Sequence, residues 1–335
     1  MHAVALRDLE AELPGTPVSD AELARELRIE ESEVARWSGG RARHESGEGE
    51  GPAALLARAT QRLLERRGLA TGEIDFLVAA TNTPDMFFPG TGCVLQSLLE
   101  APPIGALDVR ANCTGFLVAL DVGSRFVASG RYRRVLVAAA DTPSHFNGRN
   151  GRTPELACAM GDSACAVLLE RAETASEVLA VRVHTDGSRA TDYWCEYPAS
   201  RHREGSAIRG RNRLPADKVA QGLHLPRVNL EALRELALAR VPAVFDEALQ
   251  QAGVAAVDAT LIAHLLPDVE EELATRLGAR AGSIVRSTLA YSGGASLAVL
   301  LAHARSDGRV QAGQTVALAT SGAGASWGAA VIRCS

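Results

Sequence analysis

The chain has 335 residues, 47% of them hydrophobic, which is enough for two packed α/β units or one large domain. Its formal net charge of −5 argues against a nucleic-acid-binding protein, because contacts with phosphates require a clustered basic face. No apolar run reaches the roughly 18 to 20 residues of a membrane-spanning helix, and the N-terminus does not resemble a secretion signal, so we expect a cytoplasmic protein without membrane contact.

The first half of the chain alternates helical and strand-like segments. Helices are expected over 53–67 and 115–129, and β-rich runs occupy 76–81, 135–140 and 164–169. This alternation predicts a mostly parallel sheet covered by helices. Because ligands bind where strands end and helices begin in such sheets, the loops after the strands are the expected site.

Cys113 lies at one of these junctions, within "DVRANCTGFLVAL" (108–120). A buried cysteine is usually a small packed hydrophobe. Here, however, the free N–H groups and dipole of a helix start favour a thiolate, and a small residue and a glycine follow directly. Context therefore favours a nucleophile over a packed thiol. The six cysteines form no CxxC pair, so we expect neither disulfides nor a metal site.

A basic insertion covers about 187–228 and has no counterpart in the first half. Between 182 and 227 there are nine Lys and Arg residues against five acidic ones. Such a segment is either a solvated loop or a docking surface for an anionic partner, such as a carrier protein or a phosphopantetheine arm.

The two halves of the chain resemble each other. Segments match in the same order: 64–84 with 249–267, 113–141 with 291–321, and 161–170 with 324–334. Asp75 and Asp258 are 183 positions apart, as are Pro84 and Pro267. We therefore predict two duplicated α/β halves, 1–172 and 173–335, related by a pseudo-twofold axis.

His264 follows a strand-like run in the second half. A lone histidine beside an apolar strand is more often structural than catalytic. The pseudo-twofold axis, however, brings the strand ends of both halves to one cleft. His264 is therefore expected within reach of Cys113.

The chain resembles the ketosynthase III branch of the thiolase superfamily. The resemblance rests on "RARH" (41–44), "ATNTPDMFFPGTGCVLQSLL" (80–99), "ALDVRANCTGFLVALDVGSRFVASGRYRRVLVAAAD" (106–141), "MGDSACAVLLE" (160–170), "HTDGS" (184–188), "DGRVQAGQTVAL" (307–318) and "SGAGASWGAAVIR" (321–333). It implies a thiolase-like, five-layered αβαβα fold without a bound cofactor or metal.

The same resemblance implies roles for four residues. Cys113 would accept the acyl group, His264 would be the catalytic histidine, and the N–H groups of Cys113 and Gly324 would form an oxyanion hole. Phe88 would be the aromatic residue that each subunit of a homodimer lends to its partner's acyl pocket. The acyl donor would be a phosphopantetheine thioester, either coenzyme A or an acyl carrier protein.

Three departures from the family pattern modify this picture. His264 is followed by "LLP" instead of Gln-Ala-Asn, and the tryptophan and arginines that hold coenzyme A are out of register, which favours a carrier-protein donor. In "LAYSGGAS" (289–296) the family asparagine is missing, and Tyr291, Ser292 or Gly293 takes its place. In the family this asparagine and the histidine stabilise the enolate formed when a malonyl thioester loses CO2.

We therefore predict an acyltransferase of specialised, polyketide-type metabolism that does not perform decarboxylative condensation. Cys113 would load the acyl group, and His264 would deprotonate a hydroxyl, amine or thiol of a small-molecule acceptor. One alternative is a carbon–carbon condensing ketosynthase III in which Tyr291 or Ser292 replaces the asparagine. Another is a non-catalytic partner subunit, although such subunits tend to lose the nucleophile.

Overall fold

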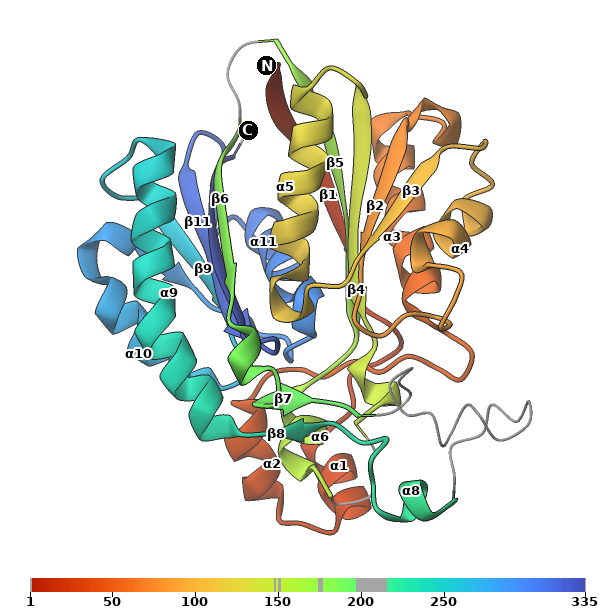
Figure 1. Cartoon of the computed structure of the whole chain (residues 1–335), viewed down its shortest axis with the longest axis vertical. Helices are drawn as coiled ribbons and strands as arrows, with labels where there is room; N and C mark the ends of the chain where they lie inside the picture. Colours follow the sequence, from red (N-terminus) through yellow and green to blue (C-terminus); the bar gives the residue numbers. More distant parts are fainter. Residues whose placement is uncertain (1, 148, 150–151, 174–176, 197–215, 335) are drawn as a thin grey trace.

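The computed structural model describes residues 2–147, 149, 152–173, 177–196 and 216–334. Two five-stranded sheets form its centre (Figure 1). The first contains β1 (Ala3–Glu12), β2 (Phe76–Ala80), β3 (Gly105–Val109), β4 (Arg134–Asp141) and β5 (Ser163–Ala172). The second contains β6 (Val178–Thr185), β9 (Ala259–Ala263), β10 (Ser283–Val285), β11 (Thr315–Gly322) and β12 (Ser326–Arg333).

The two sheets have the same topology. The order β1-β5-β4-β2-β3 corresponds to β6-β12-β11-β9-β10, and in each sheet two antiparallel pairings are followed by two parallel ones. The predicted duplication is therefore confirmed. Each sheet is mixed: four of its five strands run in the same direction, in agreement with the predicted mostly parallel sheet, and β5 or β12 runs against its two neighbours. The division of the chain at residue 172 stays a prediction, although the strands of the two sheets fall within 3–172 and 178–333.

Six helices complete five layers. Helices α3 (Pro52–Arg67) and α4 (Thr91–Leu98) cover the outer face of the first sheet, and α9 (Leu230–Ala252) and α10 (Pro267–Leu277) cover the outer face of the second (Figure 1). Between the sheets lie α5 (Gly115–Ala128) and α11 (Ser296–Ser306), each in contact with both sheets. This arrangement is the predicted αβαβα order.

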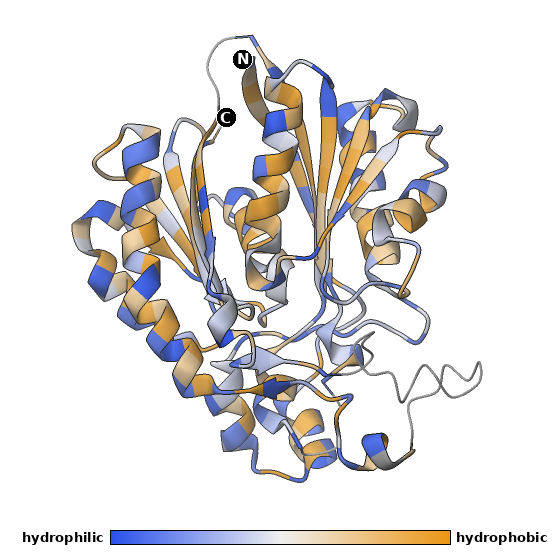
Figure 2. Ribbon diagram, viewed as in Figure 1, coloured by the Kyte–Doolittle hydropathy of each residue, from blue (hydrophilic) through white to orange (hydrophobic). Residues whose placement is uncertain are grey.

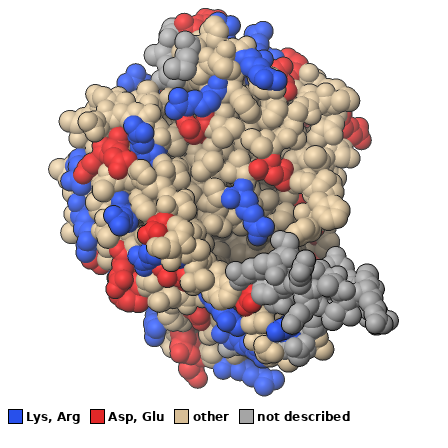
Figure 3. Space-filling view, in the orientation of Figure 1, with Lys and Arg blue, Asp and Glu red and all other residues tan. Residues whose placement is uncertain are grey.

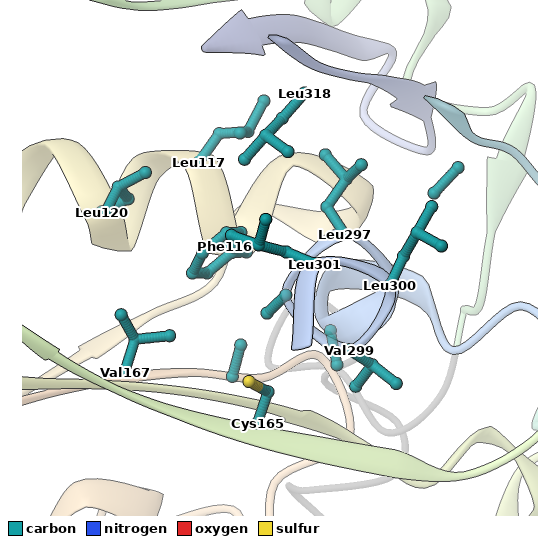
Figure 4. Close-up of a cluster of buried hydrophobic side chains, with 14 of the residues drawn as sticks. Phe116, Leu117, Leu120, Cys165, Val167, Leu297, Val299, Leu300, Leu301 and Leu318 are labelled. Carbon is teal, nitrogen blue, oxygen red and sulfur yellow. The ribbon is translucent and has the colours of Figure 1, made fainter. Parts of the chain in front are cut away.

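The central layer forms the main core. Phe116, Leu117 and Leu120 of α5 pack near Leu297, Leu300 and Leu301 of α11, and all six belong to one buried cluster (Figure 4). Both helices must be apolar over most of their surface because a sheet covers each side. The outer helices carry hydrophilic residues on their exposed sides, and the strands are largely hydrophobic (Figure 2).

The repeated aspartates explain why the two halves could be recognised. The Asp75 carboxylate accepts hydrogen bonds from the N–H groups of Arg133 and Arg134, 2.7 and 2.8 Å away, at the start of β4. The Asp258 carboxylate accepts one from Thr315 N–H, 2.7 Å away, at the start of β11. Each aspartate thus fixes the register of the same strand in its half.

Smaller elements connect and flank the two sheets. They are helices α1 (Asp20–Leu27), α2 (Glu31–Ser38), α6 (Pro154–Ala159) and α8 (Ala216–Ala220), the strand pair β7 (Tyr193–Trp194) and β8 (Arg227–Val228), and the 3-10 turns η1 (Thr71–Glu73), η3 (Pro143–His145), η4 (Gly187–Arg189) and η5 (Gly278–Ala281). The helices and strand pair gather at the lower end of Figure 1.

The described part of the basic insertion is folded. Arg189 pairs with Asp192 at 2.6 Å, and the Arg227 guanidinium lies over the Trp194 ring. Five of its arginines lie outside the described residues: Arg201, Arg203, Arg209, Arg211 and Arg213. Lys and Arg side chains are interspersed with Asp and Glu on the face seen in Figure 3. None of the helices built from described residues combines the length and apolar character needed to span a bilayer.

Candidate active site

The thiol of Cys113 lies where the two halves meet. Cys113 belongs to the 3-10 turn Asn112–Thr114 (η2) directly before α5 and is 7% exposed. The corresponding turn of the second half, Gly293–Ala295 (η6), packs against η2. A Cβ atom on Gly322, at the end of β11, would collide with Cys113 Sγ and lie 3.9 Å from the Tyr291 hydroxyl. The thiol and this hydroxyl therefore face the same glycine.

Burial dominates the ionisation of Cys113. The sequence predicts that the helix start lowers the pKa of this thiol, but burial raises its pKa above the ordinary value. The Tyr291 side chain and the backbone N–H groups of Ala323 and Cys113 oppose this rise. The prediction is wrong because desolvation of the thiolate outweighs these donors. In the free protein the thiol is protonated at neutral pH.

The N–H that approaches the thiol from the glycine-rich turn is that of Ala323. This is one residue before Gly324, the position predicted from the sequence. The repeated Gly and Ala of "SGAGAS" leave the register of this turn open, and only the backbone trace decides which N–H points inward.

His264 follows β9 and is 1% exposed. Its Nδ1 lies 3.1 Å from Leu266 N and 3.4 Å from Leu266 O. We assign Nδ1 as the acceptor of the shorter contact, which places the proton of the neutral ring on Nε2. Burial outweighs the opposing effect of the Leu266 backbone and, with smaller contributions from Arg41 and Arg234, lowers the pKa of His264 to about 4, so the ring is neutral at pH 7. Nε2 has no hydrogen-bond partner among the described residues.

Tyr291 and Ser292 differ in orientation. Tyr291 is 3% exposed, and burial raises the pKa of its hydroxyl well above the usual range. That hydroxyl makes no hydrogen bond of good geometry within the described structure, but it interacts with the Cys113 thiol, whose pKa it lowers, and with Thr320. The Ser292 hydroxyl instead accepts a hydrogen bond from Ser163, 2.6 Å away. Of the two, Tyr291 is therefore the one next to the thiol.

Asp141 organises both turns and was not recognised from the sequence. This last residue of β4 is 2% exposed and accepts hydrogen bonds from the N–H groups of Asn82 and Gly294, 2.6 and 2.7 Å away. The Asn82 side chain in turn accepts a hydrogen bond from Asn112 N–H at 2.9 Å. Burial raises the pKa of Asp141 to about 6. In the sequence, its position at the end of an apolar strand is the only signal that points to this role.

Phe88 lies on the surface. It is 78% exposed, and its neighbours Phe87 and Met86 are 72% and 45% exposed. Within the described part of the chain, no group of three or more His, Cys, Asp or Glu side chains could hold a metal ion.

Comparison with known proteins connects this geometry to one family. Models of the N- and C-terminal parts of 3-oxoacyl-[acyl-carrier-protein] synthase III match residues 107–187 and 249–334. The β-ketoacyl-[acyl-carrier-protein] synthase III of Synechococcus elongatus is 31% identical, with 98% of this chain and 96% of that protein covered. The corresponding protein of Sphingopyxis alaskensis is 33% identical, with 96% of each covered.

A solved structure supports the fold. The priming β-ketosynthase from the R1128 polyketide biosynthetic pathway superimposes with a TM-score of 0.86 at 22% identity, covering 99% of this chain and 96% of that one. At this identity the likeness shows the thiolase-like fold alone. The family models and the sequence relatives establish that the chain belongs to the 3-oxoacyl-[acyl-carrier-protein] synthase III family, the ketosynthase III branch of the thiolase superfamily.

Proposed function

We propose that this ketosynthase III enzyme loads an acyl group onto Cys113 from a phosphopantetheine thioester and transfers it to an amine or thiol of a small molecule. The observation that carries the proposal is the placement of a buried thiol between the η2 and η6 turns, beside the Ala323 N–H and the Tyr291 hydroxyl. The donor class follows the acyl-carrier-protein synthases that the chain resembles. The polyketide setting is supported by the likeness to a priming ketosynthase.

Loading begins when Cys113 releases its thiol proton to water, and the resulting thiolate attacks the thioester carbonyl. The tetrahedral oxyanion would receive hydrogen bonds from the N–H groups of Cys113 and Ala323, for which Gly324 was the sequence-based candidate. When the intermediate collapses, the C–S bond to phosphopantetheine breaks, and its thiolate takes up the proton that Cys113 lost. An acyl-enzyme and a free phosphopantetheine thiol result.

The assigned tautomer of His264 restricts the acceptor. With Nδ1 accepting a hydrogen bond and Nε2 protonated, His264 presents a donor, and its pKa of about 4 disfavours uptake of a second proton. A hydroxyl acceptor requires a general base, whereas thiols and amines provide a nucleophilic fraction near neutral pH. We therefore assign His264 to holding the acyl carbonyl oxygen, and the acceptor to an amine or thiol.

Decarboxylative condensation is the second candidate. It is favoured by two buried donors that make no hydrogen bond of good geometry, His264 Nε2–H and the Tyr291 hydroxyl, because an enolate oxygen accepts hydrogen bonds from such donors. Loss of CO2 generates the carbanion without a base. The larger tyrosine at the asparagine position argues the other way, because it takes up space beside the thiol.

A two-step assay separates the candidates. The protein is acylated with a series of acyl-coenzyme A or acyl-carrier-protein donors, and then either malonyl-coenzyme A or N-acetylcysteamine and simple amines are added. We expect acyl transfer to the thiol or amine without CO2 release. CO2 release coupled to a β-keto product would establish condensation instead. If no donor acylated the protein, it would be a non-catalytic partner subunit.

We also propose that the protein forms a homodimer. β3 lies at the edge of the first sheet, and the nearby loop exposes Met86, Phe87 and Phe88. Exposed apolar side chains beside a sheet edge are typical of an interface. We expect a dimer by sedimentation velocity and a shift toward monomer in Phe88→Asp, with Val219→Asp, another exposed apolar site, unchanged. Six free cysteines are consistent with a cytoplasmic location.

A further inference from the structure

A buried ion pair brackets the backbone of His264. The His264 N–H donates a hydrogen bond to Glu270 Oε1 at 2.8 Å, and the His264 carbonyl accepts one from Arg41 Nη1 at 3.2 Å. Arg41 Nη2 and Glu270 Oε2 are 2.6 Å apart, with their side chains 7% and 2% exposed. The Arg41 and Glu270 side chains thus bind both main-chain polar groups of His264. Burial raises the pKa of Glu270 to about 7, against the opposing effect of Arg41.

The segment that carries Arg41 also holds the Tyr291 loop. Ala42 N–H donates to Thr288 O, and Ala290 N–H donates to Ala42 O, both at 2.8 Å. Arg41, Glu270 and Tyr291 line one small cavity of about 10 Å³, which is at the lower limit for one water molecule. The three residues therefore surround a common space between the His264 and Tyr291 loops.

Stability alone does not account for this pair. Desolvation of two charges offsets most of their attraction, and apolar residues of similar size often serve as well or better in such places. The pair is, moreover, contributed by different halves: Arg41 follows α2, and Glu270 lies in the first turn of α10. Its distinctive contacts are those with the His264 backbone.

We propose that Arg41 and Glu270 are positioning residues that aim the His264 imidazole at the acyl-enzyme and fix its distance from Tyr291. Neither touches the reacting atoms. The effect on turnover rests on the proposed function, whereas the effect on the His264 ring does not. Misplacing a catalytic group by about 1 Å costs on the order of 100-fold in rate.

The test removes both charges together. In Arg41→Met/Glu270→Leu, we expect the urea midpoint to stay near that of the wild type, while discharge of the acyl-enzyme slows on the order of 100-fold and loading changes far less. The matched control is Arg134→Met/Glu170→Leu, which removes an ion pair between β4 and β5 and should leave both rates unchanged. A double variant that discharges at the wild-type rate would overturn the proposal.

A second readout works without any substrate. In ¹⁵N-histidine NMR, with His264 assigned by comparison with His264→Gln, the wild type should show Nδ1 unprotonated at pH 7, and the double variant a mixture of tautomers. An unchanged His264 signal in the folded double variant would contradict the proposal. If the wild type is never acylated, the proposed function fails while this NMR result still decides the positioning role.

A single substitution covers the case in which the double variant does not fold. Glu270→Gln keeps an oxygen that can accept the His264 N–H but breaks the charge pair, whereas Glu270→Leu loses both. Positioning predicts that Gln retains most of the discharge rate of the folded protein and that Leu does not. Equal loss in both variants would indicate a merely structural pair.

Discussion

The η2 and η6 turns share one backbone but carry different chemistry. The residue before each turn has nearly the same conformation, φ −125° and ψ 29° at Ala111 and φ −117° and ψ 39° at Ser292. The first residue of each is left-handed, with φ of 50° at Asn112 and 59° at Gly293. The middle residue is Cys113 in one and Gly294 in the other. The duplicated fold thus contains two equivalent helix starts, and only the first carries a cysteine.

Gly294 of η6 is needed for a steric reason. A Cβ atom on Gly294 would lie 2.7 Å from the Asn112 carbonyl oxygen, so no side chain fits there. Its N–H is also bound by Asp141. The η6 turn therefore packs closely against η2. Because Gly294 has no side chain, the Asn112 backbone can approach it, and η2 can present the Cys113 thiol.

Exchanging the two residues gives the largest expected effect. In Cys113→Gly/Gly294→Cys the thiol moves to a turn without space for it, so we expect acyl loading to fall by roughly 10³-fold or more. Intact-protein mass spectrometry measures the adduct, and Cys113→Gly alone is the reference. Loading of the exchanged protein at the wild-type rate would show that the two turns are equivalent and that η6 is not merely a support.

The pH dependence of the free energy of unfolding distinguishes Asp141, at the end of β4 in the first half, from His264, after β9 in the second half. The pKa of His264 is lowered to about 4 in the folded protein. The neutral ring therefore contributes its full share to the free energy of unfolding above pH 6.5, and about 3 kcal/mol of that share is lost as the pH falls toward 4. Asp141, with its pKa raised to about 6, acts oppositely, because its contribution is lost as the pH rises toward 6. Urea unfolding between pH 4 and 7 should show a shallower acid loss in His264→Gln and a steeper one in Asp141→Asn. The same slope in all three proteins would contradict these assignments.

Asp141→Asn tests the connection between the turns at constant pH. The amide retains one acceptor oxygen, so at least one of the donors that face the carboxylate loses its partner. We expect a loss of about 2 kcal/mol in the free energy of unfolding at pH 7. Asp121→Asn, at an exposed pair with Arg125, should change it by less than about 0.5 kcal/mol. Equal effects of the two substitutions would exclude a special role for Asp141.

Tyr291→Phe should have the smallest effect on stability. The hydroxyl makes no hydrogen bond of good geometry with the described residues, so its removal should change the free energy of unfolding by less than about 0.5 kcal/mol. The pKa of Cys113 should rise, because this side chain lowers it. Peptide-level mass spectrometry of iodoacetamide labelling against pH measures that pKa. An unchanged profile would mean that the hydroxyl does not act on the thiol.

The architecture could be predicted from the sequence because corresponding residues have the same structural role in both halves. Asp75 and Asp258 fix corresponding strands, and Gly130 and Gly308 adopt φ of 78° and 76° after corresponding helices. The offset between the halves falls from 183 at the aspartates to 178 at these glycines, partly because α11 has 11 residues and α5 has 14. The sequence likewise placed Cys113 at a helix start and His264 after a strand, and both lie there in the structure; their catalytic roles stay predictions.

The finer chemistry of the site was not predictable. Whether the pKa of Cys113 rises or falls depends on desolvation by residues distant in the chain, and the helix start alone predicts the wrong direction. The choice of Ala323 over Gly324 depends on where one N–H points. The contact of His264 Nδ1 with Leu266 N–H depends on the conformation of the loop, and the contact of the His264 carbonyl with Arg41 depends on packing between the halves.

The central claim is that Cys113 carries the acyl group, and intact-protein mass spectrometry tests it most directly. After incubation with acyl-coenzyme A or acyl-carrier-protein donors, the wild type should gain the mass of one acyl group, mapped by peptide analysis to Cys113, and Cys113→Ala should gain none. An adduct that persists in Cys113→Ala, or the absence of any adduct on the wild type with every donor, would contradict this claim.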